Sequence, residues 1–302
     1  MNARVKDYLG PLRVPFLLLN PSCVAAGAGA AFWRNGAIDW ADVVLALFGA
    51  VCAHASVNSL NEYSDSQTGI DARTNRTPFS GGSGTLQRHP ELAGYALGIG
   101  MLCAALTAAI GIYFIRTTGW AIVPLGVAGL ATISLYTPWL TRTSFLCLVA
   151  PGFGFGTCMV IGTDLVLGGG YSLAGFAASM VPFFLVSNLL LLNQFPDLEA
   201  DRAGGRKHFL IVHGILAGAV VYTLFSAGAY LSVVIAVVAR VLPPLSLLAL
   251  LTLPLAARAS IVALRHGTDM SKLVPALGMN VAVTLLTPLL LAAGLVLSTI
   301  LT

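Results

Sequence analysis

The sequence predicts an all-α integral membrane protein that forms one domain over residues 1–302 and crosses the bilayer with about nine helices. Two observations lead to this fold class. Hydrophobic residues make up 57% of the chain and charged residues only 9%, whereas soluble domains carry about 25% charged residues. The apolar residues also gather in runs long enough to cross a bilayer, which takes about 20 residues. The runs do not alternate in hydrophobicity, as strands of an outer-membrane barrel would.

Nine apolar runs follow one another along the chain, and each is expected to form one membrane helix. They cover approximately residues 14–33, 40–60, 92–115, 120–140, 145–167, 173–192, 209–239, 241–264 and 273–301. The run 209–239 has the length of two short helices. We treat it as one, because an extra crossing would move the basic residues after it to the other side of the membrane.

The distribution of basic residues predicts the orientation. With nine helices and a cytoplasmic N-terminus, the cytoplasmic segments carry 13 Lys and Arg residues and the opposite side carries three. Such an excess on the cytoplasmic side is typical of membrane proteins. We therefore expect a protein of the cell membrane (the inner membrane, if bacterial) with its basic loops in the cytoplasm. The net charge of only +4 gives no indication of a nucleic-acid partner.

Two long polar segments, 61–91 and 193–208, follow the second and the sixth predicted helix and so lie on the same, cytoplasmic side. Both begin with the pattern Asn-x-x-x-Asp, and the two copies are 132 residues apart. The pairs are Asn61 with Asp65 and Asn193 with Asp197, and a further aspartate follows each pair, Asp71 and Asp201. The repetition predicts two pseudo-repeated four-helix units around a central cavity.

Helical spacing predicts which of these side chains face the cavity. Residues three and four apart lie on the same face of a helix. The sets that share a face are Asn193, Asp197 and Asp201 in the second half, and His54, Asn58, Asn61 and Asp65 in the first. We therefore expect the acidic residues of both halves to point toward one another.

The combination of acidic and basic residues favours a site for a metal-bound diphosphate. Ionisable side chains near a bilayer are costly and need compensation. Mg²⁺ is usually held by one or two carboxylates together with substrate phosphates, and Arg and Lys bind the remaining phosphate oxygens. The basic residues of the two segments are Arg73, Arg76, Arg202, Arg206 and Lys207. The alternatives are surface ion pairs in solvated loops, or acidic residues that carry protons.

At these two segments the sequence resembles the UbiA-type intramembrane prenyltransferase superfamily. Its members carry a first motif of the form NDxxDxxxD or NxxxDxxxxxD and a second of the form DxxxD. The chain has the longer form of the first motif, and NQFPDLEADRAGGRK as the second. In the form of these two motifs the chain is most similar to the branch that prenylates naphthoate precursors of menaquinone. Glu62 departs from the shorter motif, and the roles of Glu62 and His54 stay open.

The resemblance implies a Mg²⁺ site and a set of substrate-binding residues. The catalytic and metal-binding residues would be Asp65, Asp71, Asp197 and Asp201. The substrate-binding residues would be Asn61, Arg73, Arg76, Tyr136, Arg142, Asn193, Arg206 and Lys207. Tyr136 and Arg142 belong to a segment that reads Tyr-x-x-x-Leu-Lys in the family. Here Thr141 takes the place of that lysine and Arg142 comes next.

The resemblance further implies that the protein transfers an isoprenoid chain from a prenyl diphosphate to an electron-rich acceptor, most naturally an aromatic quinone precursor. Two alternatives share parts of the pattern. A related terpene cyclase would use the same metal site without an acceptor. A transporter could also combine repeated halves with acidic residues near the membrane.

Overall fold

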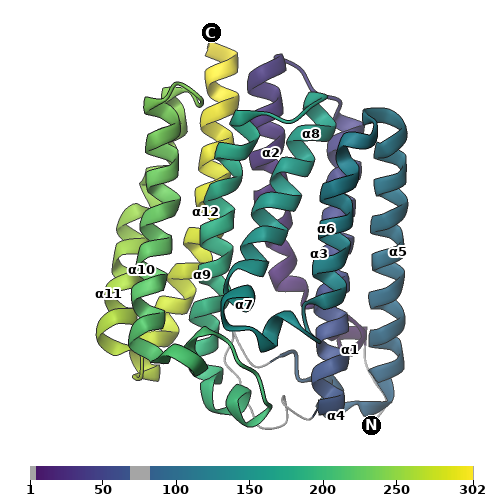
Figure 1. Cartoon of the computed structure of the whole chain (residues 1–302), viewed down its shortest axis with the longest axis vertical. Coiled ribbons are helices and arrows are strands. Elements are labelled where there is room, and N and C mark those ends of the chain that lie inside the picture. Colours follow the sequence, from purple (N-terminus) through teal and green to yellow (C-terminus); the bar gives the residue numbers. More distant parts are fainter. Residues whose placement is uncertain (1–4, 69–81, 302) are drawn as a thin grey trace.

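The computed structural model describes residues 5–68 and 82–301, and every regular element in this part of the chain is a helix. The α-helices are α1 (Val5–Leu9), α2 (Leu19–Asn35), α3 (Trp40–Thr68), α4 (Thr85–Arg88), α5 (Ala93–Thr118), α6 (Val123–Leu135), α7 (Ser144–Gly152), α8 (Gly162–Gly168), α9 (Leu173–Ala203), α10 (Phe209–Val238), α11 (Leu253–His266) and α12 (Met270–Leu301). The long helices run side by side as a bundle, and the two termini lie at opposite ends of it (Figure 1).

The membrane-spanning character is confirmed, but the count of nine full-length helices is not reached. Within the described residues, eight helical stretches are long and apolar enough to cross a bilayer. The predicted span 120–140 forms only a shorter apolar helix, Trp120–Leu135. The chain leaves the helix shortly before Pro138, since the residue before a proline disfavours helical conformation.

Several predicted spans are built from more than one kind of helix. The run 145–167 consists of α7, a π-helical segment Phe153–Ile161 and α8. The run 241–264 begins with a 3-10 helix, Pro244–Thr252, and continues as α11. The run 209–239 forms the single long α10, as predicted, although Gly214 interrupts its helical geometry with a φ of 85°.

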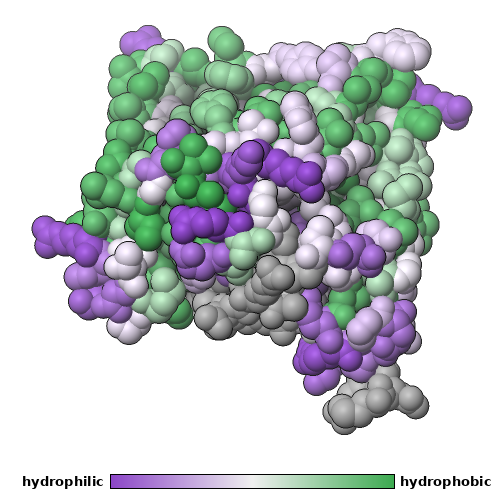
Figure 2. All heavy atoms as spheres, turned by 60° about the horizontal axis from the view of Figure 1, so that its bottom comes forward, coloured by the Kyte–Doolittle hydropathy of each residue, from purple (hydrophilic) through white to green (hydrophobic). Residues whose placement is uncertain are grey.

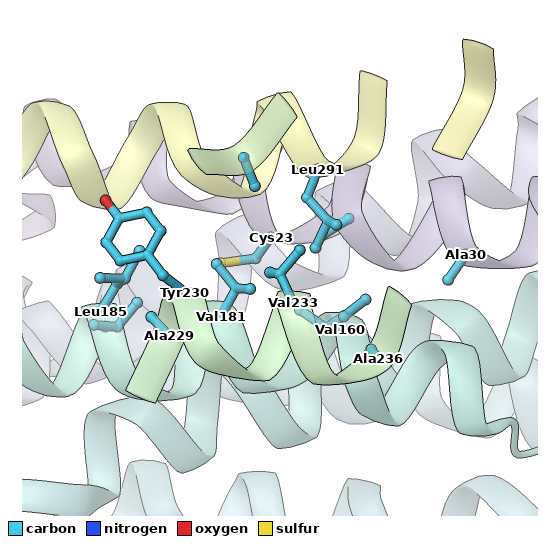
Figure 3. Close-up of a cluster of buried hydrophobic side chains, with 14 of the residues drawn as sticks. Cys23, Ala30, Val160, Val181, Leu185, Ala229, Tyr230, Val233, Ala236 and Leu291 are labelled. Atoms are coloured by element: carbon cyan, nitrogen blue, oxygen red, sulfur yellow. The ribbon is translucent and has the colours of Figure 1, made fainter. Parts of the chain in front are cut away.

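The largest hydrophobic core lies between α2, α9, α10 and α12. Figure 3 shows side chains from α2, such as Cys23, meeting Val181 of α9, Val233 of α10 and Leu291 of α12. Small residues let these helices approach closely, as is typical of membrane bundles. At Gly29 of α2, for example, an added Cβ would lie 3.2 Å from the Cα of Ala292 on α12.

Helices α5 and α6 are the least buried of the bundle. In the most apolar part of Pro90–Thr118 only 17% of the residues are buried, compared with 67% for Leu173–Ala203. The helix α6 buries none of its residues. Both helices contribute residues to the lining of the cavity described next.

Candidate active site

A cavity of about 390 Å³ lies between α3, α6, the α7–α8 stretch and α9. Its lining includes the residues whose spacing predicted a shared face on each long helix. These are His54, Asn58, Asn61 and Asp65 on α3, and Asn193, Asp197 and Asp201 on α9. The two predicted faces therefore meet across one cavity. The four-helix repeat inferred from the same spacing stays a prediction.

The acidic residues lie at the end of the bundle where α3 and α9 terminate (Figure 1). Figure 2 looks toward this end and shows hydrophilic side chains gathered there, with apolar surface along the flanks. Asp65 and Asp201 are each only 3% exposed. The polar site is thus partly withdrawn from the surface of the protein.

Arg206 joins the two halves of the site. Its Nη2 donates to both carboxylate oxygens of Asp65, at 2.7 and 2.6 Å, and its Nη1 donates to Asp201 Oδ1 at 2.8 Å. Burial acts to lower the pKa of Arg206, but the carboxylates of Asp201 and Asp65 outweigh it and raise that pKa above its ordinary value. The guanidinium is therefore a fixed positive charge between the two motifs.

A glycine turn positions this arginine. Helix α9 ends at Ala203, and Gly205 then adopts a left-handed conformation with a φ of 78°, which glycine reaches without steric cost. The turn folds the chain back, so that the backbone nitrogen of Arg206 donates to the Asp201 carbonyl at 3.0 Å. His208 follows, buried, with Nε2 3.1 Å from Asp201 Oδ2.

The donor set of the described residues suits Mg²⁺ bound together with a diphosphate. Among the described residues, no three His, Cys, Asp or Glu side chains are arranged to hold a metal ion. Mg²⁺ commonly takes only one or two carboxylates and completes its shell with phosphate and water. The site offers carboxylate oxygens, and the buried Asn193 Oδ1 has no hydrogen-bond partner within the described structure. These hard oxygen donors fit the ion.

Glu62 has a different environment from the aspartates. It is fully buried, and its Oε1 accepts from Arg13 Nε at 2.7 Å and from the Ser83 backbone nitrogen at 2.7 Å. Its Oε2 accepts from Ser83 Oγ at 2.8 Å. Arg13 also donates from Nη2 to Asn61 Oδ1 at 3.3 Å. Glu62 thus fastens the N-terminal segment and the start of the segment after residue 81 to α3.

The structure brings together some of the predicted substrate-binding residues and leaves others apart. Asn61, Tyr136, Asn193 and Arg206 line the cavity. Burial raises the pKa of Tyr136, so its hydroxyl stays protonated. Asp71, Arg73 and Arg76 lie outside the described residues.

Arg142 and Lys207, the last two of the predicted substrate-binding residues, lie apart from the others, and their role in binding stays a prediction. Both side chains are exposed and outside the cavity lining. Arg142 ends the short 3-10 turn Leu140–Arg142, in which the buried Thr141 faces the cavity instead. Lys207 stands between Arg206 and His208, which both line the cavity, but its own side chain is exposed.

Two cavity residues were missed by sequence reasoning. Arg13 lines the cavity from the N-terminal segment, where it adopts a left-handed φ of 49°. His208 lines it beside Arg206. Arg13 was counted only as a basic residue before the first span, and no spacing relates it to Glu62, 49 residues later. The sequence pattern singled out the basic pair Arg206 and Lys207 after the second motif, and His208 is the residue that follows this pair.

The comparison with protein families decides the assignment. The model of the UbiA prenyltransferase family matches residues 22–284, which is most of the chain. The chain belongs to this family. The match confirms the family expected from the motifs and, with it, the prenyltransferase class.

Among curated proteins, the chain is similar to two enzymes named 1,4-dihydroxy-2-naphthoate octaprenyltransferase. The one from Bacillus subtilis is 25% identical over 69% of the chain and 66% of its own length, just under two thirds. The one from Mycobacterium tuberculosis is 27% identical over 66% of the chain and 70% of its own length.

Solved structures share the fold. A UbiA homolog from Archaeoglobus fulgidus bound to GPP and Mg²⁺ has a TM-score of 0.63 at 14% identity, covering 95% of the chain and 99% of its own. A UbiA homolog from Aeropyrum pernix K1 has a TM-score of 0.65 at 16% identity, covering 94% and 98%. At these identities the likeness shows the fold alone.

Proposed function

We propose that the protein transfers an isoprenoid chain from a prenyl diphosphate to an electron-rich aromatic acceptor within the membrane, with Mg²⁺ as cofactor. The observation that carries the proposal is the cavity itself. It begins among carboxylates, amides and Arg206 and continues between apolar helix faces. A diphosphate with an apolar tail matches both parts, and the names of the relatives point to the same chemistry.

In the proposed reaction the bond between the allylic carbon and the diphosphate oxygen breaks, and the diphosphate leaves with the electron pair. A carbon of the acceptor attacks the allylic cation, and the acceptor then loses a proton. Mg²⁺ would neutralise the charge that develops on the diphosphate. Asp65, Asp197 and Asp201, with Asp71 outside the described residues, would hold the ion. Arg206 would turn from the carboxylates to the phosphate oxygens.

The surroundings of the site support this chemistry. Tyr136 and Asn193 line the cavity next to the acidic residues and offer hydrogen bonds to the diphosphate. Phe155 also lines it, and an aromatic face attracts a nearby cation. The apolar walls exclude water, which would otherwise capture the allylic cation before the acceptor does.

The test is a reconstitution with purified protein in lipid nanodiscs. Diphosphate release and prenylated product are measured with octaprenyl diphosphate, with and without 1,4-dihydroxy-2-naphthoate, in Mg²⁺ and in excess chelator. We expect prenylated product only when acceptor and Mg²⁺ are both present. 2-Naphthoate, which lacks the activating hydroxyls, is the matched acceptor control. Release of diphosphate with a cyclised hydrocarbon and no acceptor would indicate a terpene cyclase instead. No release under any condition would favour a transporter.

We further propose that the polar end of the cavity faces the cytoplasm of the cell, because the predicted cytoplasmic segments hold 13 of the 16 Lys and Arg residues. Single cysteines introduced at Gly204 and at Gly36, in a variant without the five native cysteines, test this. A membrane-impermeant thiol reagent applied to intact cells should label position 36 and leave position 204 unlabelled until the membrane is opened. The reverse pattern contradicts the orientation.

A further inference from the structure

The cavity continues far beyond the residues that would bind a diphosphate. Deep in the first half it is lined by α3, α5 and α6, at Gly49, Ile110, Gly111, Gly126 and Gly129. This part lies within the membrane-spanning region and its walls are almost entirely apolar. The diphosphate group of the proposed substrate accounts for the polar end of the cavity only, so the deep part is left for another portion of the substrate.

Helix geometry gives the depth of these positions. Asp65 and Gly49 are 16 residues apart on α3, which corresponds to about 24 Å at 1.5 Å per residue. A Cβ added at Gly49 would lie 3.3 Å from Ile110 Cγ2, so Gly111 of α5 lies at a similar depth. Gly126 is 10 residues before Tyr136, or about 15 Å from the polar end.

At both depths a glycine lines the cavity and leaves the space next to its Cα unfilled. A Cβ added at Gly111 or at Gly126 would meet no atom within 4 Å. At Gly129 the nearest atom would be Cys158 Cβ, at 3.9 Å. Glycine inside a helix costs about 1 kcal/mol relative to alanine, and here no helix packing demands it. The glycines keep room in the cavity at two separate depths.

We propose that this deep part holds the distal isoprene units of a long prenyl diphosphate, and that Gly126 and Gly111 determine, at two depths, the length of chain that is accepted. The proposal rests on the proposed function, because the diphosphate head fixes the tail at the polar end. An apolar, flexible chain without polar groups is what walls of this composition bind. Since the cavity is continuous with the acidic site, head and tail belong to one ligand.

The experiment places a large side chain at each depth. Gly111→Phe and Gly126→Phe are compared with Gly98→Phe, which lies on α5, is exposed, has no atom within 4 Å of its added Cβ and is outside the cavity lining. Each protein is assayed with dimethylallyl, farnesyl and octaprenyl diphosphate. An extended farnesyl diphosphate is roughly 20 Å long from ordinary bond lengths, so it reaches past Gly126 and stops short of Gly111.

The expected result is graded. Gly126→Phe should lower kcat/KM for farnesyl and octaprenyl diphosphate by about tenfold or more, and Gly111→Phe should do so for octaprenyl diphosphate only. All three variants should keep turnover of dimethylallyl diphosphate within about twofold of wild type, the range of ordinary surface effects. Gly111→Leu and Gly126→Leu take the place of any Phe variant that is not recovered folded.

Two results would overturn the inference. One is undiminished octaprenyl turnover in Gly111→Phe and Gly126→Phe, which would mean that a membrane lipid fills the deep cavity and the tail lies elsewhere. The other is an equal loss for all three chain lengths while Gly98→Phe stays normal. A wild-type protein that releases no diphosphate from any of the three substrates refutes the proposed function instead, so the two failures are distinguishable.

Discussion

The two Asn-x-x-x-Asp segments are alike in sequence but differ in their surroundings. Asn61 donates to Thr137 Oγ1 at 3.2 Å and accepts from Arg13, whereas Asn193 Oδ1 is buried without a partner in the described structure. The residues that follow the two asparagines also differ. Glu62 accepts hydrogen bonds through both carboxylate oxygens. Gln194 donates to Cys147 Sγ at 3.5 Å, and its Oε1 has no hydrogen-bond partner among the described residues.

The difference indicates that the two segments have different roles. The first segment holds the N-terminal segment and the segment from residue 82 onward in place around the cavity. The second keeps acceptor oxygens available and supplies Arg206. A repeated motif thus gives equivalent positions on two helices without giving them equivalent roles. The predictions below test this division, from the largest expected effect to the smallest.

Removing the carboxylates should abolish the reaction. Asp65→Ala and Asp201→Ala each remove a proposed oxygen ligand of Mg²⁺ and an Arg206 partner, and we expect kcat to fall by at least about 100-fold, as when other preorganised charge-stabilising groups are lost. The measurement is product formation in nanodiscs at saturating Mg²⁺. Near-normal turnover in either variant would show that its segment is not part of the metal site.

Arg206→Ala should lower the thermal stability of the protein and should make its Tm rise more strongly when Mg²⁺ is added. Breaking a buried ion pair leaves uncompensated charge and costs about 3 kcal/mol, here on Asp65 and Asp201. In the proposed site Mg²⁺ would bind the same carboxylates, so added Mg²⁺ should raise the Tm of the variant more than that of the wild type. Thermal unfolding in detergent measures both effects.

The control is Arg202→Ala, because Arg202 pairs with Glu199 on the surface, where both side chains are more than half exposed. Such pairs contribute at most about 1 kcal/mol. An Arg206→Ala protein with the Tm and Mg²⁺ response of Arg202→Ala would contradict the bridging role.

Truncation of Glu62 should lower stability, whereas truncation of Gln194 should affect substrate binding. Glu62→Ala removes three hydrogen bonds and leaves Arg13 and Ser83 without them, and a lost bond to a charged group costs about 1.5–3 kcal/mol. We expect a clear loss of thermal stability. Gln194→Ala should change stability by less than about 1 kcal/mol and should act on KM for the diphosphate. Equal Tm changes in the two variants would remove the distinction between an anchoring and an open segment.

The smallest effects are expected at Arg142 and Lys207. Both are exposed and outside the cavity lining, so Arg142→Ala and Lys207→Ala should keep kcat/KM within about twofold, the range of ordinary surface substitutions. Steady-state kinetics with the prenyl diphosphate checks this. A tenfold rise in KM for either variant would restore the role that the sequence pattern predicted.

The sequence predicts the parts of the molecule that depend on local periodicity. The apolar runs locate the long helices, and the spacing of Asn58, Asn61 and Asp65 identifies the face of α3 that lines the cavity. Helical repeat and hydrophobicity determine both, and both are properties of neighbouring residues.

Other features depend on contacts between distant segments and leave no local signal. The left-handed turn at Arg13 becomes useful only because Glu62 lies opposite it, and Arg206 reaches Asp65 across 141 positions of sequence. The early end of α6 has a cause in the sequence, Pro138. Because apolar residues continue on both sides of this proline, hydrophobicity alone predicted a longer helix.

The weak packing of α6 has a mechanical consequence. The helix buries none of its side chains, yet both of its ends are tied: Tyr171 donates to the Ala121 carbonyl at 2.7 Å, and Asn61 donates to Thr137 at 3.2 Å. Its middle, the stretch around Gly126, lines the cavity on one face and carries exposed residues such as Val127 on the other. The bilayer is therefore expected to support this part of the cavity wall from outside, so that its lateral pressure and thickness influence how far a hydrophobic molecule inside the cavity can displace the helix.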